Sequence, residues 1–477
     1  MSEMLESWEG VASSAHIVVC AAGELSEQNH QRLKVISGME ELPQFPGRAG
    51  NVVSFFDVSG LKKICLLHVF SGDQAFKNQS TVRTILSKNE MSSIAIVLDP
   101  SLGDLAEDIT LAGMLSSYKV GSYKSGQQKP AIVPGIFGFQ SVANFENAAK
   151  TAKAMKLAMF LIDTPPNIKN PDYIAQMIGE QFRFSGMEVR ILDKQELEAG
   201  GYGAILSVGQ ASEYGSYLAC ITYKGALEKE GIDLAMVGKG VTFDTGGISL
   251  KDPANMHYMK SDLGGAAAVL GAMHLIGDLG LEVNVTALVP IVENAIDSRA
   301  TRPGDVITAY GGKTIEIIDT DAEGRLILAD ALQHAVKELN PEYLVDLATL
   351  TGNCVAALGY SAAGLFAPNQ GIATLWHDVG NEVGERCWPM PMYAEYGEMM
   401  ESDIADIKNF HGKPIVGAIT AAKFLEFFTN KHPKWAHLDI AGVAFGDVPY
   451  ARTKVATAFG VRLLVKFIEK HILTHHN

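Results

Sequence analysis

Cysteine is scarce in this chain: five residues among 477, widely spaced and without a Cys-x-x-Cys pair. Cysteines used in this way are typical of buried, reduced thiols, and the pattern excludes a disulfide framework. Long apolar runs are also missing, since none reaches the roughly 18 residues that a membrane-spanning helix needs. The first ten residues are acidic and lack the basic start and apolar core of a signal peptide. These absences predict a soluble, cytoplasmic protein that has no membrane partner.

Positive charge is outnumbered, because 39 lysines and arginines face 54 aspartates and glutamates and leave a formal net charge of −15. This balance argues against nucleic acid as a partner, since proteins that bind it usually carry a basic face. Hydrophobic residues make up 47% of the chain and charged residues 19%. That composition is typical of a globular protein and excludes disorder over most of the length.

Several common catalytic and cofactor-binding motifs are absent. The segment 312–314 resembles the end of a phosphate-binding loop, but the position of its first glycine holds Ile307. The segment 238–240 begins like a dinucleotide-binding fingerprint, but the third glycine position holds Phe243. The chain also has no Gly-x-Ser-x-Gly nucleophile elbow and no His-Glu-x-x-His zinc helix. The chemistry of the protein must therefore lie elsewhere.

Short apolar runs alternate with helical stretches along the chain, which predicts an α/β fold with a mixed sheet flanked by helices. A helical stretch over 144–162 ends at two prolines, which deny further helix. We therefore expect two domains, an N-terminal α/β domain over 1–165 that ends in this connecting helix, and a larger catalytic α/β domain over 166–477. The strands expected in the first domain are 15–21, 62–70, 92–99 and 131–139.

The second domain shows the same alternation. Its expected strands are 187–192, 217–223, 233–238, 283–290, 313–319, 343–349 and 436–441. Its expected helices are one that begins near Pro171 and others near 263–279, 325–338, 371–386, 418–430 and 455–471.

Three glycine-rich segments of the second domain concentrate carboxylates, lysines and an arginine at expected strand ends and helix starts, namely 237–251, 259–266 and 319–326. Loops at the carboxyl ends of strands line the ligand crevice in α/β sheets. A single carboxylate in a first helical turn needs no function, because it complements the helix dipole. The whole set exceeds what capping requires. Two or more hard divalent cations would explain it, because carboxylates suit such ions and a metal pair needs a bridging carboxylate.

At these segments the sequence resembles the leucyl (cytosol) aminopeptidase family of two-metal exopeptidases. Residues 320–326, Thr-Asp-Ala-Glu-Gly-Arg-Leu, agree with the family signature Asn-Thr-Asp-Ala-Glu-Gly-Arg-Leu, whose first position holds Asp319 here. Thr245 likewise stands where the family more often has serine. The order and spacing of all three segments also match. The resemblance implies a variable N-terminal α/β domain, a catalytic C-terminal domain and a homohexamer.

The resemblance also implies a ligand set for two divalent cations, Mn²⁺ or Zn²⁺ with Mg²⁺ as an alternative. Asp244 and Glu323 would bridge the two ions. Asp321 would complete the first site, and Lys239 and Asp262 would complete the second. An amine binds a metal only when it is unprotonated, so Lys239 is expected to have a strongly depressed pKa beside the cations.

Two further residues, Lys251 and Arg325, would be catalytic by the same resemblance. Water activated by the two metals would attack the peptide carbonyl, Lys251 would help to stabilise the oxyanion, and a bicarbonate ion held on Arg325 would act as general base. The expected reaction is the release of N-terminal amino acids, leucine and other apolar residues, from peptides.

The family pattern further assigns a pocket for the first substrate side chain, although ordinary core packing would explain the same residues equally well. Ala444 stands where many family members have methionine, so the pocket should be roomier and strict leucine preference is in doubt. The pocket residues are Met259, Thr349, Gly352, Ala441 and Ala444.

Two other functions stay open at this point. The bridging carboxylates with Lys251 and Arg325 could clamp a phosphoryl group in a two-metal phosphoesterase. The chain could also be a binding or regulatory module that retains a dead site, but the intact ligand set argues against that.

Overall fold

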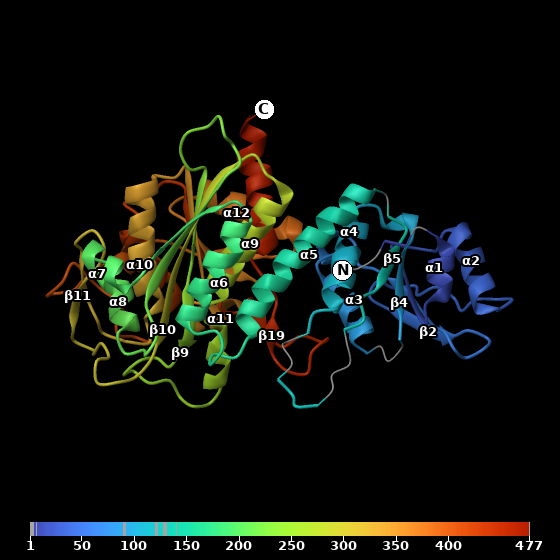
Figure 1. Ribbon diagram of the computed structural model, residues 1–477, viewed down its shortest axis with the longest axis horizontal. Helices are drawn as coiled ribbons and strands as arrows, with labels where there is room; N and C mark the ends of the chain where they lie inside the picture. Colours follow the sequence, from blue (N-terminus) through green and yellow to red (C-terminus); the bar gives the residue numbers. More distant parts are fainter. Residues whose placement is uncertain are drawn as a thin grey trace. The chain divides into compact units, whose positions relative to one another are not determined.

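The computed structural model describes residues 4–5, 7–88, 92–119, 123–126, 131–139 and 141–476. The chain forms two compact units, one of Met1–Lys156 with Asp447–Lys454, and one of Leu157–Gly446 with Val455–Asn477 (Figure 1). The division falls within helix α5, Val142–Asp163, which is the connecting helix expected over 144–162. Among the described residues, no helix combines the length and apolar character that crossing a membrane requires. All five cysteines are free thiols.

The first unit is built on a five-stranded sheet with the order β2-β3-β1-β4-β5. Neighbouring strands run parallel except β2, which is antiparallel to β3. The four strands expected here are confirmed, whereas the sequence does not predict β2, an edge strand whose residues alternate between exposed and half-buried. The strands are β1 His16–Ala21, β2 Val52–Phe56, β3 Lys63–His68, β4 Ile94–Leu98 and β5 Gly135–Phe137, and the helices are α1 Trp8–Ser13, α2 Glu27–Ser37, α3 Lys77–Ser87 and α4 Leu105–Ser116.

The second unit contains a nine-stranded mixed sheet with the order β15-β14-β17-β13-β8-β10-β7-β6, and β9 pairs with β10. Strand β8 lies between β13 and β10 and runs parallel to both, so the carboxyl ends of these three strands meet at one edge. The strands of this sheet are β6 Glu188–Leu192, β7 Tyr217–Lys224, β8 Leu234–Gly238, β9 Gly240–Asp244, β10 Asn284–Asn294, β13 Tyr343–Ala348, β14 Ala363–Phe366, β15 Cys387–Pro389 and β17 Trp435–Asp439.

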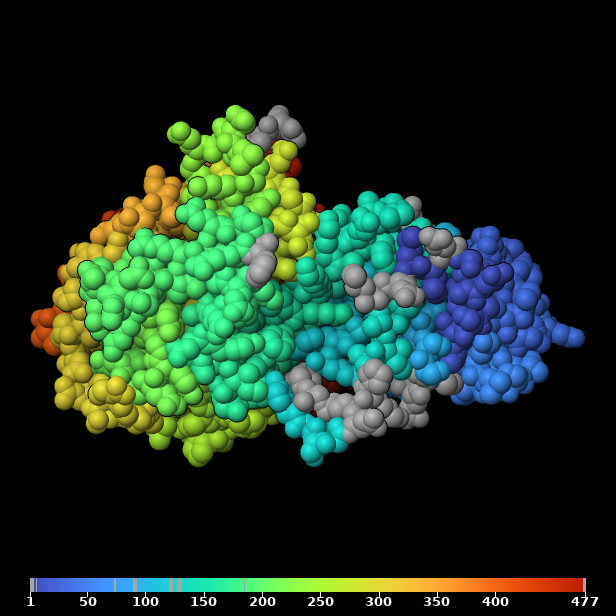
Figure 2. All heavy atoms as spheres, viewed as in Figure 1, coloured from blue at the N-terminus to red at the C-terminus, as the bar shows by residue number. Residues whose placement is uncertain are grey.

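Helices flank this sheet (Figure 1), and in the space-filling view the green surface around α6 covers the strands on the face that is seen (Figure 2). The predicted α/β class with a mixed, helix-flanked sheet is confirmed. The helices are α6 Pro171–Phe184, α7 Lys194–Gly200, α8 Gly203–Gly209, α9 Gly264–Leu279, α10 Gly324–His334, α11 Gly352–Leu358, α12 Gln370–Val383, α13 Ala394–Glu398, α14 Gly417–Phe427 and α15 Val461–Phe467.

Two expected elements of this unit differ from the structure. The helix expected over 455–471 was wrong at its start, because Val455–Ala456 is strand β19, paired with β18 Phe445–Gly446, and α15 begins only at Val461. The strand expected over 313–319 is shorter, since β12 covers only Thr314–Glu316. It belongs to a small separate sheet with β11 Val306–Thr308 and β16 Ile407–Lys408.

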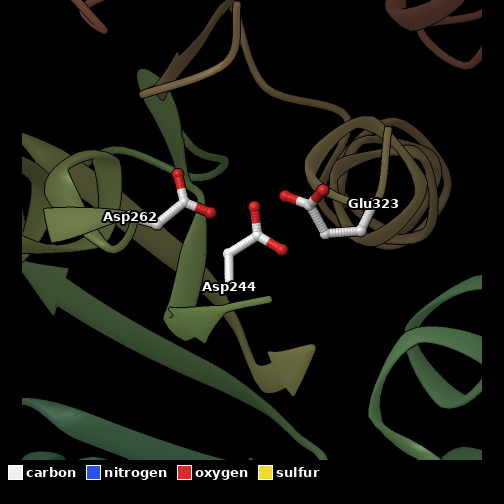
Figure 3. Close-up of side chains that lie close together, drawn as sticks. All are labelled: Asp244, Asp262 and Glu323. Atoms are coloured by element: carbon white, nitrogen blue, oxygen red, sulfur yellow. The ribbon is translucent and has the colours of Figure 1, made fainter. Parts of the chain in front are cut away.

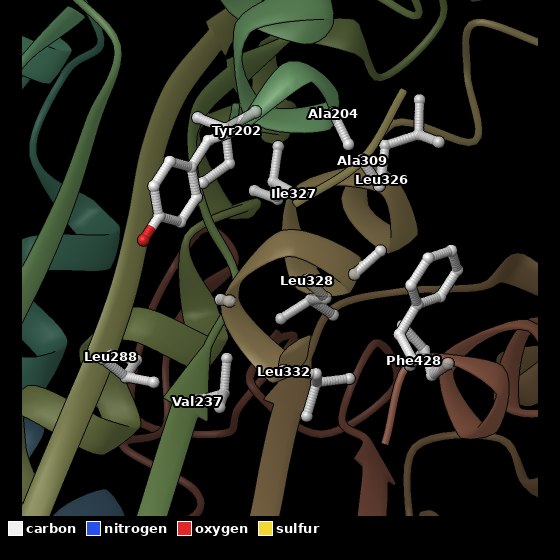
Figure 4. Close-up of a cluster of buried hydrophobic side chains, with 14 of the residues drawn as sticks. Tyr202, Ala204, Val237, Leu288, Ala309, Leu326, Ile327, Leu328, Leu332 and Phe428 are labelled. Carbon is white, nitrogen blue, oxygen red and sulfur yellow. The ribbon is translucent and has the colours of Figure 1, made fainter. Parts of the chain in front are cut away.

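Helix α10 lies at the centre of the main hydrophobic core, and all eleven of its residues are buried. Leu326, Ile327, Leu328 and Leu332 pack among side chains of the sheet and of the neighbouring helices (Figure 4). Each fully buried leucine or isoleucine contributes roughly 1.5–3 kcal/mol. A helix buried on every side cannot shift easily, so the first residues of α10 are held in place against the sheet edge.

Candidate metal centre

Three buried carboxylates converge at the carboxyl edge of the large sheet. Asp244 is the last residue of β9, Asp262 lies just before α9, and Glu323 lies just before α10. One oxygen from each can be chosen so that all three lie within 4.8 Å of one another. The close-up shows the three side chains pointing toward a common space from three different elements (Figure 3). The fold thus brings together carboxylates that are up to 79 positions apart in the sequence.

Two lysine ammonium groups lie among these carboxylates. Lys239 follows β8, and its Nζ is 2.9 Å from Asp262 Oδ2 and 2.8 Å from Glu323 Oε1. Lys251 Nζ is 2.8 Å from Asp244 Oδ2 and also forms an ion pair with Asp321. The structure therefore gathers all five predicted metal ligands, together with Lys251, into one connected cluster.

Burial and mutual repulsion govern the pKa values of the acidic groups. Burial raises the pKa of Asp262 well above its ordinary value, although the ammonium of Lys239 works in the opposite direction. Burial and the negative charge of Asp244 raise the pKa of Asp321 to about 7. The pKa of Glu323 is lowered, because the ammonium groups of Lys239 and Lys251 outweigh the effect of its burial. Crowded, buried carboxylates of this kind are typical of a site that binds positive charge.

The pKa of Lys239 would have to fall before its amine could bind a metal. Burial alone lowers it, but the carboxylates of Asp262, Glu323 and Asp244 outweigh burial and raise the pKa above its usual range. The carboxylates by themselves thus favour the ammonium form. The depressed pKa expected for a ligating amine requires the positive charge of cations beside it.

Two neighbouring polar side chains fix the carboxylates. Asn294, the last residue of β10, donates from Nδ2 to Asp244 Oδ1 over 2.8 Å, and the same oxygen accepts the Gly246 N–H, also over 2.8 Å. Thr349 Oγ1, which follows β13, donates to Asp262 Oδ1 over 2.9 Å. No motif in the sequence marks Asn294 as a residue of the site. The feature that could have pointed to Asn294 is its position at the end of the strand that pairs with β9.

Arg325 is buried beside the cluster and only partly satisfied. Its Nη1 donates to the backbone carbonyl of Asn409 over 2.7 Å, whereas its Nε is buried and has no hydrogen-bond partner. Burial lowers the pKa of Arg325 to about 10, so the group stays positively charged at neutral pH. Asn409 in turn accepts from the Ile318 N–H over 2.8 Å and donates to the Asp319 carbonyl over 2.6 Å. This arrangement suits an anion near the start of α10.

The residues fit a pair of divalent cations. Glu323 Oε2 is buried without a hydrogen-bond partner, as expected of an oxygen that a cation would occupy. The donor set is rich in carboxylate oxygen, which hard cations prefer. Gly324 allows the close approach of Lys239, because a Cβ at that position would lie 2.5 Å from the lysine Nζ.

The residues predicted to line the substrate pocket lie on or next to several elements of the second unit. Thr349 and Ala444 both border Gly264, since a Cβ on that glycine would lie 2.8 Å from Thr349 Cγ2 and 3.1 Å from Ala444 Cβ. Met259 lies in the 3₁₀ turn η3, Met256–Ser261, just before Asp262. Gly352 begins α11, and Ala441 follows β17. Their pocket role stays a prediction.

The family model of the cytosol aminopeptidase catalytic domain matches residues 156–465, well over half of the chain. The chain belongs to the cytosol aminopeptidase family. It is a metal-dependent aminopeptidase, and so a hydrolase, as the resemblance implied. This membership also decides against the phosphoesterase interpretation.

Curated relatives agree with this family membership. A probable cytosol aminopeptidase of Chlorobium phaeobacteroides is 36% identical over 480 residues, which cover 94% of this chain and 95% of the relative. One from Chlorobium limicola is 45% identical over 322 residues, which cover 67% of this chain and 63% of the relative.

Solved structures with the same fold include a cytosol aminopeptidase from Coxiella burnetii, 31% identical with a TM-score of 0.82, covering 99% of both chains. Another is the bottromycin maturation enzyme BotP in complex with Mn, 28% identical with a TM-score of 0.82, covering 95% of this chain and 99% of that one. Both likenesses extend over both units of this cytosol aminopeptidase family member.

Proposed function

We propose that this enzyme releases N-terminal amino acids, leucine and other apolar residues, from peptides with the help of two divalent cations. The observation that carries the proposal is the cluster of buried carboxylates and lysines in a chain of this family. The cluster combines an oxygen-rich donor set with an orphaned carboxylate oxygen on Glu323. Metal-dependent peptide hydrolysis uses such a set, whereas a merely structural core would not bury so much charge.

Asp244 and Glu323 would bridge the two ions, Asp321 would complete one site, and Lys239 and Asp262 would complete the other. Mn²⁺ or Zn²⁺ is the proposed occupant, with Mg²⁺ as the alternative. When bound, the pair would lower the pKa of a water molecule and polarise the peptide carbonyl. Support for Mn²⁺ comes from the related enzyme BotP, whose structure has been solved in complex with Mn.

Lys251 would stabilise the negative charge that develops on the carbonyl oxygen. Its side chain is 21% exposed, whereas that of Lys239 is 3% exposed, so substrate can reach the Lys251 ammonium. The carboxylates of Asp244, Glu323 and Asp321 outweigh burial and raise the pKa of Lys251 above its usual range. Lys251 therefore stays a cationic hydrogen-bond donor at neutral pH, as oxyanion stabilisation requires.

Arg325 would hold a bicarbonate ion, which can accept and return a proton. The support is a guanidinium that is buried, charged and unpartnered at Nε, at the start of α10. An anion there would gain from both the arginine and the helix N-terminus.

We further propose that the enzyme acts as a homohexamer in the cytoplasm, with Met259, Thr349, Gly352, Ala441 and Ala444 around the first substrate side chain. The family resemblance supports the assembly and the pocket, and the names of the relatives support the location. We also propose that residues 1–165 and 166–477 act as the family's variable and catalytic domains.

The decisive experiment measures hydrolysis of aminoacyl anilides of Leu, Met, Ala, Arg and Glu by metal-stripped protein, with Mn²⁺, Zn²⁺, Mg²⁺ or no metal added back. We expect metal-dependent release, fastest with the apolar substrates. A nitrophenyl phosphate serves as the control substrate. Turnover of the phosphate without any anilide release, or no release under any metal from folded protein, would contradict the proposal.

A further inference from the structure

Lys169 is a fully buried lysine that the proposed mechanism does not use. It lies between α5 and α6 and has no exposed surface. Its Nζ donates to the backbone carbonyls of Leu161 and Ile162, both over 2.8 Å, and to the backbone carbonyl of Lys260. An ammonium has three donors, so all of them are satisfied by carbonyl oxygens.

A buried charge of this kind is costly unless directed contacts offset the cost. Burial lowers the pKa of Lys169 well below its ordinary value, and the positive charge of Lys260 adds to this effect. The Leu161 and Ile162 carbonyls lie in the last turn of α5, where the helix dipole favours positive charge. A methionine would fill similar space without the charge. The lysine therefore supplies something that volume does not, namely three directed hydrogen bonds.

A second lysine makes the reciprocal contact. Lys260 Nζ donates to the carbonyl of Asp163, the last residue of α5, over 2.9 Å. Asp163 is itself anchored, because its Oδ1 accepts the Ala456 N–H over 3.0 Å. Lys169 and Lys260 thus join the end of α5 to the turn η3 in both directions. We call these two side chains and their contacts the lysine brace.

The brace contacts the backbone at Lys260, two residues before the proposed metal ligand Asp262. The Asp262 N–H donates to the Met259 carbonyl over 3.2 Å, so residues 259–262 form a closed turn. Within a closed turn, fixing the Lys260 carbonyl also fixes the position of Asp262. The Asp262 carboxylate then faces Lys239 and accepts from Thr349.

We propose that the lysine brace is a positioning element of the metal centre, which holds η3 so that Asp262 can bind its cation. This inference rests on the proposed role of Asp262 as a metal ligand. A purely structural alternative would have Lys169 stabilise only the end of α5, with no effect on the metal. The two interpretations differ in whether loss of the brace changes metal affinity or only thermal stability.

The test is a titration of Mn²⁺ into metal-stripped, full-length protein by isothermal calorimetry, with the melting temperature measured in parallel. In Lys169→Met we expect one of the two Mn²⁺ equivalents to bind about tenfold or more weakly, as is typical when a group that orients a ligand is lost. Excess Mn²⁺ should restore most of the anilide hydrolysis. Lys194→Met, at an exposed lysine of α7, is the matched control and should bind Mn²⁺ like the wild type.

The outcomes separate the two proposals. A wild-type protein that binds no Mn²⁺ overturns the proposed metal centre itself. A wild type that binds two equivalents and a Lys169→Met variant that binds both equally well, with only a lower melting temperature, overturns the brace. If Lys169→Met does not fold, Lys260→Met removes the hydrogen bond to the Asp163 carbonyl together with a cation–π contact to the Phe445 ring, and we expect several-fold weaker binding at the same Mn²⁺ site. Unchanged affinity in that variant overturns the brace as well.

Discussion

Glu323 joins the two halves of the cluster, since its Oε1 meets Lys239 and its Oε2 is buried without a hydrogen-bond partner. We expect Glu323→Ala to abolish nearly all aminopeptidase activity with the fold retained, because the first turn of α10 holds no other acidic side chain that could take its place. Anilide hydrolysis and circular dichroism measure the two effects. Glu188→Ala, at an exposed position of β6, is the control. Unchanged turnover in Glu323→Ala would refute the bridging role.

Asp321 gives the metal affinity a pH dependence. Its pKa is raised to about 7, so below that pH it increasingly holds a proton, which a cation must displace. We therefore expect Mn²⁺ affinity to fall by up to about tenfold for each pH unit below 7 from this one proton, and this contribution to vanish well above pH 7. Calorimetric titrations at pH 6, 7 and 8 measure the trend. Asp321→Asn should make the dependence less steep by this one proton, whereas the proton that a cation must displace from Lys239 is still present in that variant. An equally steep dependence in Asp321→Asn would contradict the assignment.

The proposed ligand set could be named from the sequence, because its members lie in short glycine-rich segments that carry a specific signature. The polar residues that surround these side chains could not be named in this way. Asn294, Asn409 and Lys169 are single polar residues far from those segments along the chain. Their roles depend on which strand ends and helix ends meet, and only the fold determines that.

Helix α9 packs so tightly on the sheet that its second residue must be glycine. A Cβ on Gly265 would lie 1.9 Å from the Leu347 carbonyl oxygen and 2.8 Å from the Lys239 N, both backbone atoms. We expect Gly265→Ala to lower the free energy of unfolding by roughly 3 kcal/mol, as overpacking does, and to displace Lys239. Urea denaturation of the metal-stripped protein measures the loss.

Gly277→Ala in the same helix is the matched control. A Cβ there would meet only the terminal methyl of Met187, a flexible side-chain end that can move aside. The gain in helix propensity of roughly 1 kcal/mol should offset this adjustment. Equal destabilisation by the two substitutions would show that the close backbone approach at Gly265 is unimportant.

The elements that the sequence predicted best are buried strands with continuous apolar runs, such as β8 and β13, and the uninterrupted helix α5. The short strands were harder to recognise. Strand β19 has only two residues, and its Ala456 N–H bonds to the Asp163 side chain. The turn to α15 then passes through Gly460 with φ of 102°. Such boundaries depend on tertiary partners that carry no local pattern.

The second unit leaves several large apolar side chains in solvent when the chain is considered alone. Tyr360, Tyr393 and Ile404 are each about two-thirds exposed, and Leu250 is 58% exposed. Isolated exposed apolar residues are normal on a monomer, so these alone do not establish an interface. They are, however, the kind of side chain that a closed, symmetric assembly buries.

The mass of the protein in solution distinguishes isolated exposed side chains from the interfaces of the proposed homohexamer. Size-exclusion chromatography with light scattering should give a mass close to six chains. The mass should hold over a tenfold dilution, because an interface large enough to close a stable ring does not dissociate readily. A clean monomer would refute the assembly. A mass that falls steadily on dilution would indicate weak association of exposed apolar side chains rather than a built hexamer, and the pocket residues would then have to complete the site within one chain.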